Sequence, residues 1–130
     1  MRVSALLVPT FMAIGAAAFA QPYGWVPGST VDSPKSGNKM CIVDLSNGDL
    51  LTDPEGWQFT TDSAGADPLI PGFSEDGSIA YVLVGGDHDV DPTGHIYVFE
   101  TEPVISALRA DETPPGPIQT ILLPDRKSVV

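Results

Sequence analysis

Residues 73–100 read FSEDGSIAYVLVGGDHDVDPTGHIYVFE and contain the two strongest strand signals in the chain. Residues 79–84 and residues 95–100 are apolar runs rich in β-branched and aromatic side chains, the composition that favours a β-strand. A Ser-Glu-Asp-Gly-Ser turn precedes the first run, and a loop rich in glycine and aspartate joins it to the second. We therefore predict that the two segments are adjacent, antiparallel strands.

Strand signals of lower strength surround this pair. The apolar run at 39–45 leads into Asn47-Gly48, a strong hairpin signal, so a return strand is expected directly after it. Further strands are predicted at 57–61 and 117–123, where apolar and polar residues alternate or β-branched residues gather. The 13 glycines and 13 prolines divide the chain into short pieces. Short strands separated by such turns predict an all-β fold with antiparallel sheets.

Helical signals are weak. Residues 104–110 come nearest to the apolar spacing of a helix, but Pro103 and the Pro114-Pro115 pair confine this segment to about two turns. A helix shorter than about 12 residues is marginal without tertiary support. We therefore expect strands and loops over most of the chain.

An internal repeat is visible in the order of the strands. Residues 39–44 and 95–100 share one pattern, in which a polar residue is followed by four apolar residues and an acid. A repeat of about 40–50 residues with several strands in each unit is typical of a β-propeller blade.

Two segments resemble one blade of a YVTN-type or lactonase-like β-propeller. In those blades a Ser-Pro-Asp-Gly turn opens a Tyr-Val strand, as in residues 73–82, and a Val-x-Val-Phe strand follows, as in residues 94–101. Glu75 stands where proline is usual, and the connecting loop lacks the usual asparagine. The resemblance covers residues 39–130 and implies partial or truncated β-propeller-like blades, since a closed propeller needs about four to eight blades.

The resemblance implies little about activity, because the same blade carries lactonases, quinoprotein dehydrogenase subunits and binding scaffolds. None of their active-site motifs is present, so no catalytic or cofactor-binding residue is assigned. Two functions stay open. In the first, the chain is an exported, acidic, β-propeller-like binding or scaffold module and a fragment of a larger propeller. In the second, it is part of a lactonase-like or quinoprotein dehydrogenase-like enzyme whose active site lies outside this chain.

Residues 1–20 have the three parts of a cleavable signal peptide. Arg2 gives a positive start, residues 3–18 are mostly apolar, and Ala18-Phe19-Ala20 has the small-x-small pattern of a cleavage site. The apolar run is shorter than the roughly 20 residues of a membrane span. We therefore predict a secreted protein, extracellular or periplasmic, that begins directly after Ala20.

The predicted mature chain divides into a Pro/Gly-rich segment at 21–38 and the propeller-like region at 39–130. The formal net charge of the whole sequence is −11, and such a surface repels nucleic acid phosphates and anionic lipid heads. We exclude nucleic acid, and the membrane after cleavage, and expect an unidentified protein or small-molecule partner. The lone cysteine, Cys41, lies in an apolar run and is expected to be a buried, inert thiol.

The loop between the two strongest strands holds a metal-site candidate. Asp87, Asp89 and Asp91 alternate as at the start of a calcium loop, where carboxylates converge on one hard cation. Pro92 stands where an EF-hand requires glycine, and Val98 where it requires a bidentate glutamate. These two differences exclude an EF-hand and leave a looser calcium site, or a plain turn, in which aspartate is also common.

Other candidates have less support. His88 and His95 would allow a transition-metal variant of the same site. Two aromatic pairs, Tyr23 with Trp25 and Trp57 with Phe59, would stack on sugars if exposed, although strand-spaced aromatic residues more often belong to a core. No serine lies in the G-x-S-x-G context of a nucleophile elbow.

Overall fold

The computed structural model describes residues 22–28, 39–60, 68, 70–85 and 93–123. The predicted signal peptide at 1–20 lies outside the described residues, and so do Asp87, Asp89 and Asp91. Within this part of the chain no helix has both the length and the apolar character to cross a membrane.

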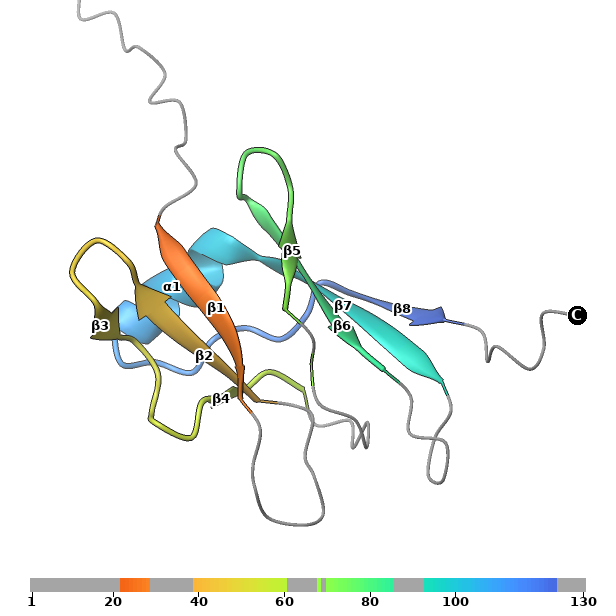
Figure 1. The fold of residues 1–130 in the computed structure, drawn as a ribbon, viewed down its shortest axis with the longest axis horizontal. Helices are drawn as coiled ribbons and strands as arrows, with labels where there is room; N and C mark the ends of the chain where they lie inside the picture. The colour runs from red at the N-terminus through yellow and green to blue at the C-terminus, as the bar shows by residue number, and fades with distance from the viewer. Residues whose placement is uncertain (1–21, 29–38, 61–67, 69, 86–92, 124–130) are drawn as a thin grey trace, which may run out of the picture.

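The first sheet is centred on β2 (Lys39–Asp44), and all of its pairs are antiparallel (Figure 1). β1 (Tyr23–Gly28) lies on one edge of β2, and β3 (Asp49–Leu50) and β4 (Trp57–Gln58) pair with opposite ends of its other edge. β3 and β4 are thus two parts of one interrupted return strand. Gly48 has a φ of 79°, which fits the hairpin predicted from Asn47-Gly48.

The second sheet is a meander of four antiparallel strands in sequence order. It consists of β5 (Gly72–Phe73), β6 (Ile79–Val84), β7 (Gly94–Glu100) and β8 (Gln119–Leu123). β6 and β7 are adjacent, with Val82 opposite Tyr97. The antiparallel pair predicted at 79–84 and 95–100 is confirmed, and so are the all-β class and the antiparallel sheets.

Several strands differ from the prediction; β5 was not predicted, and β8 begins at Gln119 and not at residue 117. Residues 21–38 carried no strand prediction, yet β1 lies there, because Trp25 enters the core and β1 pairs with β2 along its whole length. The strand predicted at 57–61 is shorter, since β4 ends at Gln58, and Phe59 enters the core beyond the ladder.

The helix α1 (Thr101–Arg109) is longer than the sequence indicated, and it follows β7 directly. Pro103 lies in its first turn, where backbone N–H groups have no intrahelical partner, so the proline does not delimit the helix. Val104 and Ile105 are buried, at 0% and 3% exposed. Their burial supplies the tertiary support that a helix of nine residues requires.

The core lies between the two sheets and is rich in aromatic rings. Trp25 of β1 meets Phe99 of β7, with ring centroids 6.1 Å apart, and Trp57 of β4 meets the same ring at 5.3 Å. The fully buried side chains come from both sheets and from the helix: Met40, Ile42, Val82, Val84, Tyr97, Phe99 and Val104. Because these contacts join the sheets face to face, they form one hydrophobic core.

Candidate functional site

The predicted calcium site cannot be placed, because Asp87, Asp89 and Asp91 lie outside the described residues. Among the residues that are described, no group of three or more His, Cys, Asp or Glu side chains could hold a metal ion. His95 is described, and its ring stacks on the Tyr97 ring with centroids 5.7 Å apart. Its Nδ1 atom is buried without a hydrogen-bond partner in that part of the structure. The calcium site stays a prediction.

Cys41 is half-buried rather than buried, which corrects the expectation of a core thiol. The side chains of β2 alternate between the two faces of the sheet. Met40 and Ile42 point into the core and are 0% exposed, so Cys41 lies on the outer face.

The aromatic residues considered as sugar platforms divide between core and margin. Trp25 and Phe59 are 5% and 2% exposed, which confirms that they belong to the core. Tyr23 and Trp57 are half-buried and pack against that core from its margin. Of these four, only Tyr23 and Trp57 therefore retain surface that a ligand would reach.

The turn Ser74–Ser78, which carries part of the propeller resemblance, is organised around one carboxylate. Asp76 accepts hydrogen bonds from Ser78 N at 3.0 Å, from Ser78 Oγ at 2.7 Å and from Ser74 Oγ at 2.7 Å. These donors favour the ionised form, and they lower the pKa of Asp76 to about 2, with Ser78 N–H the largest contributor. Thr101 joins the turn to the start of α1 by donating from Oγ1 to Gly77 O at 2.6 Å.

This turn predicts an acid-sensitive contribution to stability. The pKa of Asp76 is lower in the folded state than the unfolded value of about 3.9, so its ionised form stabilises the fold. This stabilisation is complete above about pH 4 and is lost as the pH falls through about 2. We expect Asp76→Asn to lower the melting temperature at neutral pH, and the difference from the wild type to shrink as the pH approaches 2. Glu75→Gln is the control, because Glu75 makes none of these hydrogen bonds. A difference equally large at pH 2 and at pH 6 would contradict this role of the carboxylate.

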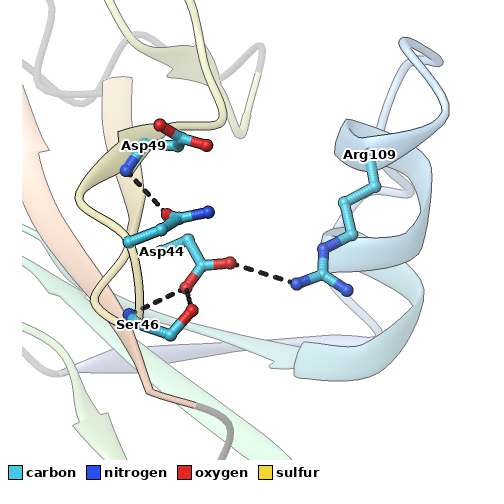
Figure 2. A network of polar contacts seen from close by, with 5 residues as sticks. Asp44, Ser46, Asp49 and Arg109 are labelled. Carbon is cyan, nitrogen blue, oxygen red and sulfur yellow. Dashed lines mark hydrogen bonds and ion pairs between the residues drawn. The ribbon is translucent and has the colours of Figure 1, made fainter.

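A second polar network ties α1 to the first sheet (Figure 2). Asp44 is 5% exposed and accepts hydrogen bonds from Ser46 N at 2.9 Å and from Ser46 Oγ. Its other oxygen, Oδ2, lies 3.1 Å from Arg109 Nη2 in the last turn of the helix. The Ser46 hydrogen bonds, with a smaller contribution from Arg109, lower the pKa of Asp44. Arg109 also lies over the Tyr23 ring, 5.4 Å from its centroid.

An open groove runs between the return strand of the first sheet and the segment that follows α1. Two adjoining hollows form it, with volumes of about 430 and 530 Å³. Four residues line both hollows: Trp57, Gln58, Thr113 and Pro114. Both hollows are largely open to solvent, as in a surface groove.

The two hollows differ in chemistry. Asp53, Asp111 and Glu112 line the first, and all three carboxylates are exposed. Phe59, Gly116 and Pro117 line the second. The groove thus has an acidic end and a more apolar end, with the half-buried Trp57 between them. This arrangement is suited to binding.

Both walls of the groove are held in place. The Trp57 ring packs edge-on against Phe99 and lies 6.2 Å from the Trp25 ring. On the opposite wall, Glu112 N donates to Ala107 O at 2.9 Å, and Asp111 adopts a φ of 56°. Arg109 pairs with Asp44 and so holds the end of α1 against the first sheet. The position of Asp111 and Glu112, which closely follow the helix, is therefore fixed as well.

Only part of this groove could be predicted from the sequence. Trp57 and Phe59 are candidates from the sequence, as sugar platforms, whereas no pattern points to Asp53. Asp111 and Glu112 are an adjacent acid pair, a pattern that is most often a solvated edge. Their position opposite Trp57 depends on the course of α1, which no local pattern predicts.

Comparisons with protein-family models, with curated proteins and with solved structures found no match to this chain.

Proposed function

We propose that the protein is an exported binding or scaffold module of propeller-like blades that works within a larger stack of β-sheets. Two features support blades: the four-stranded meander of β5 to β8, and its face-to-face packing on a second antiparallel sheet. The organised Ser74–Ser78 turn adds to the resemblance. Export rests on the predicted signal peptide at 1–20.

One observation carries the proposal: the outer face of the second sheet is mostly apolar. The register places Ile79, Tyr81, Leu83, Ile96, Val98 and Ile121 on the face that points away from the core, together with the polar residues Glu100 and Gln119. Tyr81 is 41% exposed and Ile121 38%. A sheet with one solvated face normally presents polar residues there, so this face is suited to covering by another apolar surface.

The first sheet repeats the arrangement. Val26 and Cys41 are partners in the register and lie on its outer face, as do Val43 and Leu50, with the polar Lys39 and Gln58 at one end. Val26 is 51% exposed and Leu50 45%. Contiguous exposed apolar surface marks interaction sites. Both outer faces are therefore suited to contact with further sheets, in the way that the two inner faces contact each other.

Self-association of the purified chain tests this proposal. With no other partner present, we expect assemblies larger than a monomer in sedimentation velocity, and more assembly at high salt, which screens the net charge of −11. The double variant Tyr81→Lys/Ile121→Lys should return the chain to a monomer. Since lysine reduces the net negative charge, this loss of assembly would not come from added repulsion.

The matched control is Ile70→Lys/Ile118→Lys, which makes the same charge change at residues 84% and 59% exposed. Neither residue lies on the outer face of the second sheet. We expect this control to assemble like the wild type. A monomeric wild-type chain at all salt concentrations, or equal assembly of both variants, would contradict the proposal.

A further inference from the structure

The groove beside Trp57 has a charge distribution that defines its partner. The three carboxylates of its acidic end, Asp53, Asp111 and Glu112, lie around one hollow of about 430 Å³. None of them forms an ion pair with another described residue. The two described cations bind elsewhere, Lys39 to Glu55 at 3.2 Å and Arg109 to Asp44 at 3.1 Å.

The rest of the groove offers apolar contact. Trp57 and Pro114 line both hollows, and Phe59 and Pro117 line the second. A cation near an indole ring gains from the attraction of the ring quadrupole, which a neutral ligand does not. Together the two ends fit an extended segment that carries a positive side chain beside an apolar one.

We propose that this groove binds an extended, basic peptide segment of a partner protein, with a Lys or Arg side chain in the acidic hollow and an apolar or proline residue in the other. The proposal concerns the groove and is independent of the outer faces that carry the proposed stacking. The net charge of −11 would steer such a partner toward the chain. The carboxylates and Trp57 then select it at the groove.

Titration of the full chain with a synthetic peptide of alternating Lys and Pro tests the proposal, with Trp fluorescence and calorimetry as readouts. We expect saturable binding that weakens as salt is raised, and no binding of the same peptide with Glu in place of Lys. The variant Asp53→Asn/Asp111→Asn/Glu112→Gln should weaken binding about tenfold or more, by analogy with close charge pairs at interfaces. Asparagine tolerates the positive φ of Asp111, so the wall should keep its shape.

The matched control is Asp49→Asn/Glu75→Gln/Glu100→Gln, which removes the same net charge at exposed residues that do not line the groove. We expect this control to bind within about twofold of the wild type, since long-range steering affects both variants alike. Equal weakening of both variants would show unspecific attraction and overturn the proposal. Tighter binding of a neutral oligosaccharide, or no binding of the basic peptide, would overturn it too.

Discussion

Replacing Phe99 by alanine is expected to lower the free energy of unfolding by about 3–5 kcal/mol, the cost of removing a buried phenylalanine ring. Phe99 is 0% exposed and contacts three rings of the opposite side of the core. Trp25 and Trp57 belong to the first sheet, and Phe59 directly follows β4. Its loss would leave a cavity at the contact between the two sheets. For a domain with a total stability of about 5–15 kcal/mol, this change removes a large share.

Urea denaturation, followed by Trp fluorescence and by circular dichroism, measures this loss. Phe73→Ala is the control, because Phe73 also meets the Trp25 ring, at 5.9 Å, but is 44% exposed. We expect the control to lose no more than about half as much free energy, since less apolar area is returned to water. Equal losses would mean that the ring cluster is not the centre of the core.

Gly56→Ala is expected to lower the free energy of unfolding by about 2–4 kcal/mol, because two costs add. Gly56 has a φ of 88°, which L side chains rarely adopt. A Cβ atom there would lie 3.1 Å from Met40 O and 3.3 Å from Cys41 Sγ, against the central strand of the first sheet. Because Gly56 directly precedes Trp57, we also expect a shift in Trp fluorescence.

Gly48→Ala separates the two costs. Gly48 has a similar φ of 79°, but a Cβ atom would meet nothing within 4 Å. The conformational cost alone, about 1–2 kcal/mol, is therefore expected in this control. Equal losses of stability for Gly48→Ala and Gly56→Ala in urea denaturation would show that the crowding at Met40 is relieved without cost.

Local pattern was sufficient for some elements and insufficient for others. β6 and β7 were predicted with correct pairing because their apolar runs are bounded by Gly-containing turns, and both signals are local. β1 was missed because Gly24, Pro27 and Gly28 hide its pattern, and its pairing with β2 is what makes it a strand. α1 was underestimated because burial of its apolar side chains, and not intrinsic propensity, stabilises it.

The candidate site was harder to predict than the fold. The Asp44–Arg109 ion pair joins residues 65 positions apart in the chain. Asp111 and Glu112 meet the surroundings of Trp57 only because α1 turns the chain back across the first sheet. Such proximity is a property of the tertiary structure, and one sequence without its relatives carries no direct signal of it.

The order of strands has a consequence for how the chain reaches its fold. In both sheets every ladder joins strands that are consecutive in the chain or nearly so. Pairing of sequence neighbours closes shorter loops than pairing of distant strands would, although residues 101–118, which include α1, separate β7 from β8. Each sheet can therefore form as its own segment becomes available. We therefore expect the contact of Trp25 and Trp57 with Phe99, which needs both sheets, to form last.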